Sequence, residues 1–148
     1  MMDFMKKITF RQQLQRNAVA LISLVVAISS FAYNSWRNEQ TELNRNQRFA
    51  SFEILLKLNE LQQLVFHRIY DPLLVEKGNA RMGWTHIITI NDLSQVLPQP
   101  LYDESQKLLN VWDANWSDLS IDSEGSKAVL AEIDSLREVN VSLLKTLK

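Results

Sequence analysis

The sequence contains no cysteine among its 148 residues. Disulfide bonds, thiolate metal sites and a cysteine nucleophile are therefore excluded. Glycine and proline are also scarce, with three of each. Because these residues interrupt helices most often, such low numbers favour long helices. The length suits one domain of ordinary size.

The chain also has no strong excess of either charge, since 16 basic residues face 17 acidic ones. The distribution is uneven, because residues 1–36 carry a net charge of +3 and the remainder carries −4. An acidic body disfavours nucleic-acid binding. A basic tip, an apolar run and a mildly acidic body are the parts of a membrane-tethered domain.

An uncharged run covers residues 17–36 and contains the longest apolar stretch of the chain. A membrane-spanning helix usually needs ~20 residues, and this run reaches that length. Tyr33 and Trp36 would lie at the membrane interface, where amphipathic aromatic rings are enriched. The run therefore predicts a transmembrane helix that stays in place as a signal-anchor, with residues 1–16 as a cytoplasmic basic tip.

A cleavable signal peptide is the alternative interpretation of the same run. Ser30 and Ala32 are small residues at the two positions that a signal peptidase reads. Against cleavage, the segment before the run is long for a signal peptide, and helical sequence continues past Ala32. More basic residues precede the run than follow it, which places the N-terminus in the cytoplasm and the body in the periplasm or outside the cell.

Residues 37–48 are almost wholly polar and predict a stalk. Beyond them, apolar residues recur with the period of a helix, and Phe52 and Leu56 lie on a second face. The helix is expected to end at about Tyr70, before Asp71 and a proline. The main stripe consists of Ile54, Leu58, Leu61 and Val65.

The rest of the body predicts further helices. A loop over 72–84 is followed by a short helix at about 85–97 and a third helix at about 101–119. Ser126 is expected to cap the last helix, whose apolar stripe Asn140 interrupts. The expected fold is all-α: a membrane helix that continues into an up-down antiparallel bundle over 49–148, with three long helices and one short one.

Two sets of residues suggest metal binding only weakly. His67 and Asp71 can share a helix face, with His86 as a third ligand, but a partly exposed histidine near a helix end and an aspartate that begins a turn explain them better. The acidic set lacks the ligand spacing of a calcium loop and fits a solvated surface. That set is Asp113, Asp118, Asp122 and Glu124. No metal or other cofactor is expected.

Aromatic residues and one carboxylate pair are the remaining candidates. Trp84, Trp112 and Trp116 either belong to the core or line a ligand pocket or partner groove. Asp103 and Glu104 are adjacent, so they do not face each other on a helix. They are expected to favour the start of a helix rather than to act as acid and base.

The stretch YNSWRNEQTELNRNQRFASFEILLKLNELQQLVFHRIYD and the later GWTHIITINDLSQVLP resemble a group of short, uncharacterised bacterial inner-membrane proteins. The resemblance covers about residues 30–100 and includes the W-R-N-E-Q…N-R-N segment. It implies one membrane helix with a helical periplasmic body, and it carries over no catalytic residue. The architecture alone is also similar to helical sensor modules of bacterial membrane receptors, although a second membrane helix is missing.

The sequence favours a non-enzymatic accessory or scaffold protein that binds another envelope protein or a second copy of itself. The expected contact residues beside the membrane are Arg37, Glu42, Arg45 and Arg48. The alternative is a small-ligand sensing module that signals through a partner, with the three tryptophans around the ligand. A hydrolase or metal enzyme built on the two histidines is a third hypothesis.

Overall fold

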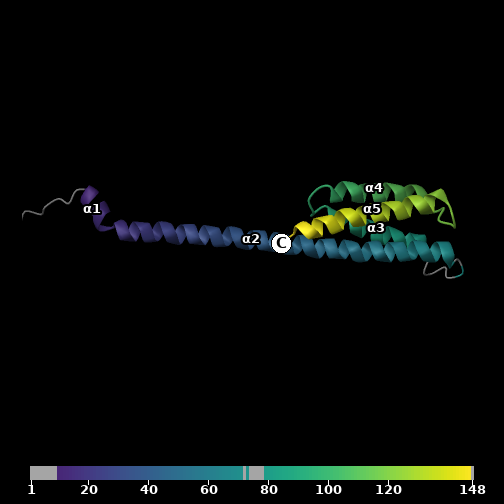
Figure 1. Cartoon of the computed structure of the whole chain (residues 1–148), viewed down its shortest axis with the longest axis horizontal. Helices are drawn as coiled ribbons and strands as arrows, with labels where there is room; N and C mark the ends of the chain where they lie inside the picture. Colours follow the sequence, from purple (N-terminus) through teal and green to yellow (C-terminus); the bar gives the residue numbers. More distant parts are fainter. Residues whose placement is uncertain (1–9, 72, 74–78, 148) are drawn as a thin grey trace, which may run out of the picture. The chain divides into compact units, whose positions relative to one another are not determined.

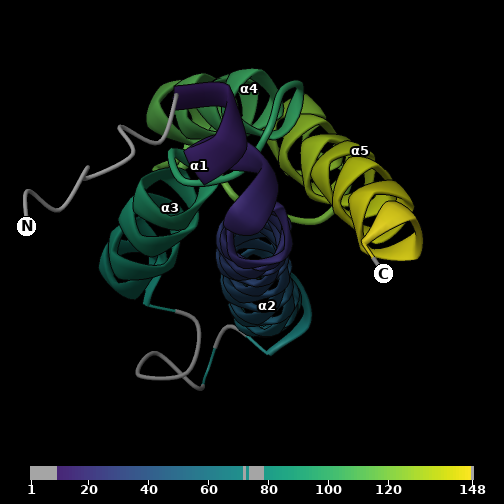
Figure 2. The ribbon, with the colours of Figure 1, turned by 90° about the vertical axis from the view of Figure 1, so that its left-hand side faces the viewer.

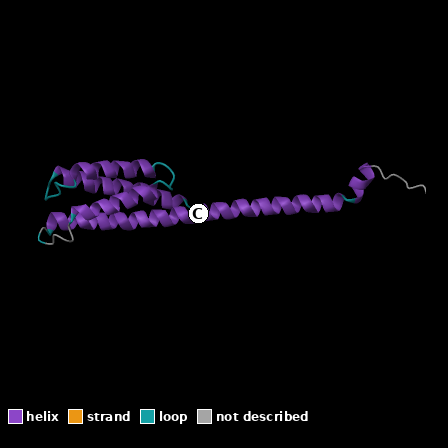
Figure 3. Ribbon diagram, turned by 180° about the vertical axis from the view of Figure 1, so that it is seen from behind, coloured by secondary structure: helices purple, strands orange, loops and turns teal. Residues whose placement is uncertain are grey.

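The computed structural model describes residues 10–71, 73 and 79–147, which form helices and turns without any strand (Figure 3). The all-α prediction is therefore confirmed for this part of the chain. The helices are labelled in Figure 1. They are α1 (Phe10–Arg16), α2 (Ala18–Tyr70), α3 (Ala80–Ser94), α4 (Leu101–Asn115) and α5 (Glu124–Thr146).

The chain divides into two compact units, one up to Glu42 and one from Leu43 onward. The division falls inside the polar segment 37–48 that the sequence predicts as a stalk. The first unit holds α1 and the first part of α2, and the second holds the remainder of α2 with α3, α4 and α5.

The core face of α2 follows the predicted stripe. Ile54, Leu58 and Leu61 have no exposed surface, and α2 ends at Tyr70 as expected. The N–H of Asp71 donates to the carbonyl of His67 over 3.0 Å and closes the last turn. The proline expected to stop the helix, at position 72, lies outside the described residues.

The prediction for α3 is wrong in its start and in its relative length. The helix begins at Ala80 instead of 85, because the side chain of Asn79 caps it by accepting the N–H of Arg81 over 3.1 Å. Gly83 lies inside the helix, where a Cβ would meet the indole of Trp112 at 2.1 Å. Since α3 and α4 both have 15 residues, the described part of the bundle does not consist of one short helix and three long ones.

The connection between α4 and α5 also differs from the prediction. Helix α4 ends at Asn115, before the expected residue 119, although Leu119 still packs into the core. The N-cap of α5 is Ser123 rather than Ser126. The hydroxyl of Ser123 accepts the N–H of Ser126 over 3.1 Å, so Ser126 lies in the first turn.

All four helices of the second unit contribute to one core. Viewed end-on in Figure 2, α3, α4 and α5 lie with α2 around a common centre. Polar links join the pairs: Gln106 donates to Asn91 over 2.8 Å between α4 and α3, and Arg137 donates to Gln62 over 2.6 Å between α5 and α2. The largest side chains with almost no exposed surface are Trp112, Ile54, Leu58, Leu61, Ile87, Ile90, Leu101, Leu108, Ile133 and Leu136.

Candidate functional site

The first part of α2 exposes a continuous apolar surface. Within the described chain, α2 is the one helix that is long and apolar enough to cross a membrane, and none of its apolar window is buried. The hydroxyl of Ser23 donates to the carbonyl of Val19 over 2.8 Å, so this polar group is satisfied within the helix. The exposed rings of Tyr33 and Trp36 lie 6.2 Å apart at the end of the run.

The expected contact residues fall on both sides of the division between the two units. Arg37 and Glu42 lie in the first unit, whereas Arg45 and Arg48 lie in the second, and all four are exposed. The guanidinium of Arg48 donates to the backbone carbonyl of Leu147. This bond ties the start of the second unit to the end of α5.

The structure separates the two histidines that the sequence groups as metal ligands. His67 Nδ1 lies 3.0 Å from a carboxylate oxygen of Asp71, as the spacing predicts. His86 instead faces Glu60, with 3.2 Å between Nδ1 and Oε2, and Lys57 Nζ lies 2.6 Å from the same oxygen. The described residues contain no group of three side chains arranged to hold a metal ion.

The surroundings of His86 change its titration. Burial lowers the pKa of His86, the Glu60 carboxylate opposes this effect, and Lys57 adds to it. Nδ1 is buried and lacks hydrogen-bond geometry toward Glu60, despite the short distance. The imidazole is therefore held in its neutral form more strongly than a free histidine.

The three tryptophans belong to one side of the core. Trp112 has no exposed surface, and its indole packs on the backbone of Gly83. Trp84 and Trp116 are partly buried against the core and meet edge to face, with ring centroids 6.5 Å apart at 69°. This arrangement fits packing better than the walls of a ligand pocket.

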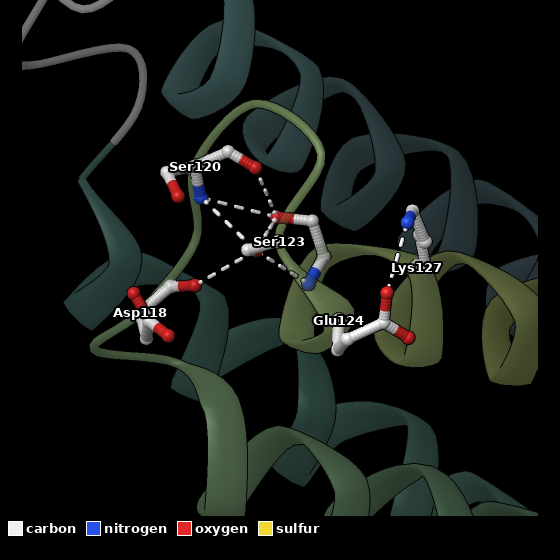
Figure 4. Close-up of polar contacts among 6 residues, drawn as sticks. Asp118, Ser120, Ser123, Glu124 and Lys127 are labelled. Carbon is white, nitrogen blue, oxygen red and sulfur yellow. Dashed lines mark hydrogen bonds and ion pairs between the residues drawn. The ribbon is translucent and has the colours of Figure 1, made fainter.

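The acidic segment between α4 and α5 is tied by hydroxyl and backbone groups. As Figure 4 shows, the hydroxyl of Ser123 donates to the backbone carbonyl of Asp118 over 3.1 Å. The hydroxyl of Ser126 accepts from the N–H of Ser120 and donates to its carbonyl. The Glu124 carboxylate pairs with Lys127 at 2.9 Å. Asp118 thus contributes its backbone rather than a carboxylate cage.

The carboxylates of Glu104 and Glu132 interact in the structure, which the sequence pattern does not predict. Glu104, in the first turn of α4, pairs with Lys107 at 2.6 Å and accepts from Ser135 of α5 over 3.4 Å. Burial raises the pKa of Glu132, the nearby Glu104 carboxylate raises it further, and Lys107 partly compensates. Glu132 Oε1 is buried and accepts no hydrogen bond from the described chain. The available signal was a glutamate directly beside Ile133 in the apolar stripe of α5.

A groove of about 510 Å³ separates the segment before α4 from the end of α5. Its apolar floor includes Leu101, Val139 and Leu143, and Glu138 supplies one carboxylate at its side. Such a lining suits an apolar segment or small molecule better than a strongly charged one. The other lining residues are Pro98, Gln99, Pro100, Ser142 and Thr146.

The chain matches no protein-family model, no curated protein and no solved structure.

Proposed function

We propose that this chain is a single-pass membrane protein that acts, without enzymatic activity, as an accessory or scaffold subunit of the cell envelope. The observation that carries the proposal is the apolar stretch of α2 over residues 18–36, none of which is buried, in a chain whose second unit has its own packed core. In this proposal the membrane is the bacterial inner membrane, the N-terminus is cytoplasmic and the body is periplasmic.

A membrane is the environment that such a surface fits. Contiguous apolar patches of this kind are rare on soluble proteins, because exposing them to water is unfavourable. No part of the apolar window packs inside the chain, so a role as a buried core helix finds no support. Tyr33 and Trp36 lie together at the end of the run, which supports an interfacial position for both rings.

The body is proposed to be an up-down antiparallel bundle that binds a protein partner. Its tryptophans fit the core, which supports a binding scaffold over a site built around these rings. The polar segment with Arg37, Glu42, Arg45 and Arg48 offers charged groups for a contact beside the membrane. Charged groups at the rim of an interface provide specificity and faster association more than affinity.

Native mass spectrometry of the C-terminally tagged chain, extracted in mild detergent, tests the proposal. The expected result is an intact chain that retains residues 1–32 and is bound to a protein partner. A free monomer that begins at Tyr33 would show that the run is a cleaved signal and would overturn the proposal.

Arginine replacement tests the contact beside the membrane. Changing Arg37, Arg45 and Arg48 together to alanine is expected to weaken the complex. Changing the exposed Arg68 and Arg81 to alanine controls for the loss of charge elsewhere. If the same amount of partner co-purified with both variants, the polar segment would not be part of the interface.

A small-ligand sensing module is the alternative, and the groove between Pro100 and α5 is the observation that favours it. A ligand of the groove should raise the unfolding temperature of the wild-type chain. Ser142→Phe places a ring in the groove and should abolish that increase, whereas Ser117→Phe, at an exposed position outside it, should not. A ligand that stabilises all three chains equally would argue against this site.

A further inference from the structure

A second apolar face runs along the part of α2 that belongs to the second unit. Five large side chains on it are strongly exposed, and we refer to them as the outer row. They are Phe49 (66%), Phe52 (57%), Leu56 (53%), Phe66 (42%) and Tyr70 (66%). Apolar groups of this size are normally buried, so five of them along one face of a helix are informative.

The outer row follows a seven-residue repeat. Phe49, Phe52 and Leu56 are separated by steps of three and four, and the same steps lead through Asn59 and Gln63 to Phe66 and Tyr70. These are the a and d positions of three consecutive heptads and the a position of a fourth, the pattern of a helix that packs against another helix.

The core that the described residues form does not use this face. On α2 the fully buried side chains occupy the opposite side of the helix, as Ile54, Leu58 and Leu61 show. Because a helix turns 100° per residue, they lie roughly half a turn away from the outer row. The heptad pattern therefore calls for a partner that the described residues do not provide.

Neighbouring helices leave the outer row accessible. Glu60 faces His86 of α3 on one flank of α2, and Gln62 accepts from Arg137 of α5 on the other. Figure 2 shows α3 and α5 on the two sides of α2. A hollow of about 500 Å³ lies on the open face, lined by Gln63, Phe66, His67, Tyr70 and Asp71.

We infer that the outer row is the contact between two copies of this chain, which pack α2 against α2 as a parallel two-stranded coiled coil. The parallel direction rests on the proposed function, since two copies anchored in one membrane by the same helix point the same way. Symmetric packing would bring the Phe52, Leu56 and Phe66 side chains of each copy against their own counterparts.

Charges along the flanks favour the parallel direction independently. In a parallel coiled coil, each g position of one helix lies beside an e position of the other. Leu55 of one copy would then lie beside Glu60 of the second copy, and Gln62 beside His67 of the second copy, so no like charges meet. An antiparallel arrangement that aligns Leu56 with Phe66 brings the two Glu60 carboxylates opposite each other, which is unfavourable.

The size and polarity of the contact define its strength. If the surface that the five side chains now expose were buried in both copies, on the order of 1,000 Å² of accessible surface would be removed from water. This area lies at the low end of specific interfaces. Asn59 and Gln63 would each face their own counterpart, and such polar layers fix the register at a cost in stability. The anchor would compensate by raising the effective concentration of the two copies.

The absence of cysteine allows a direct test in the full-length chain within membranes. Leu56→Cys and Phe66→Cys should each give a disulfide-linked dimer on mild oxidation. Arg68→Cys is the matched control, because position 68 is exposed but lies on the far side of α2 from Phe66. It should remain monomeric.

Two further results decide between the occupants of the outer row. Links that form only when Leu56→Cys and Phe66→Cys chains are mixed would overturn the parallel direction. No link at any position of the row would overturn the dimer and leave lipid or another protein as its occupant. Carbonate extraction of the same membranes tests anchoring separately, so failure of the anchor and failure of the dimer are distinguishable.

Charge insertion provides a second measurement. Leu56→Glu places two carboxylates against each other in the dimer and should weaken association by about tenfold or more, which is about 1.4 kcal/mol. Arg68→Glu is the control for added negative charge. Circular dichroism should show unchanged helix content in both variants. Equal dimer content in a folded Leu56→Glu variant would contradict the inference.

Discussion

The side-chain amide of Asn140 in α5 donates a hydrogen bond of 2.8 Å to the backbone carbonyl of Ser51 in α2, inside the core. Both residues have no exposed surface. The amide that interrupts the apolar stripe of α5 is thus a cross-link between the first and last helices of the second unit. The Oδ1 atom of Asn140 and the hydroxyl of Ser51 find no hydrogen-bond partner among the described residues.

Replacement of Asn140 should destabilise the chain, whereas replacement of Ser51 should not. Asn140→Ala removes the hydrogen bond and leaves a cavity, so it should lower the free energy of unfolding by about 2–3 kcal/mol. Ser51→Ala removes a buried hydroxyl without a partner and should be neutral or stabilising by up to about 1 kcal/mol. Urea titration in detergent, followed by circular dichroism, measures both. Equal destabilisation by both changes would contradict this assignment.

Gly83→Ala should destabilise the chain although alanine favours helices. A Cβ at this position would meet Trp112 at 2.1 Å, and the indole is fully buried with little space to move. The expected cost is about 2 kcal/mol, against a gain of about 1 kcal/mol from helix propensity. The loss should shrink in a Trp112→Phe background, where the smaller ring leaves room. An equal loss in both backgrounds would show that strain lies elsewhere.

Glu132→Gln should stabilise the chain near neutral pH. The folded-state pKa of Glu132 is raised by burial and by Glu104, so folding favours the protonated acid. Its stabilising contribution is present below the unfolded pKa of about 4.5 and is lost as pH rises through the raised folded pKa. The gain from Glu132→Gln should therefore disappear at about pH 4. Glu138→Gln, an exposed change on the same helix, is the control.

His86 should make the chain less stable in mild acid. Burial, partly opposed by Glu60, lowers its folded pKa below 6.5, so the unfolded chain takes up a proton first. Stability is present above the unfolded pKa and declines as pH falls through the lower folded value. Unfolding curves between pH 7 and 5 should show this decline, and His86→Gln should reduce it. His67→Gln leaves His86 in place, so the decline should persist there.

Local sequence pattern was sufficient to predict which residues of a helix are buried and where α2 ends. The stripe of α2 is buried as its period predicts, and the helix ends at Tyr70, next to Asp71. Leu136 and Ile133 of α5 are buried for the same reason. The all-α class follows from such stripes, because each needs another apolar face to cover it.

Contacts between distant residues could not be derived from local pattern. Gly83 appeared to belong to a loop, because its use depends on Trp112, which is far along the chain. The pairing of Glu104 with Glu132 and that of Asn140 with Ser51 likewise depend on how the helices align. The cap of α5 was misassigned because Ser123 and Ser126 offer the same hydroxyl three residues apart.

The connection between α4 and α5 has a further consequence for the behaviour of the chain in different solvents. Ser120, Ser123 and Ser126 bind one another and the backbone through neutral groups alone. Added salt screens charges but leaves such bonds almost unchanged. Mild acid likewise does not titrate hydroxyl or peptide groups, so it should loosen the segment around His86 before this connection. The hairpin of α4 and α5 would then stay closed where three serines hold it.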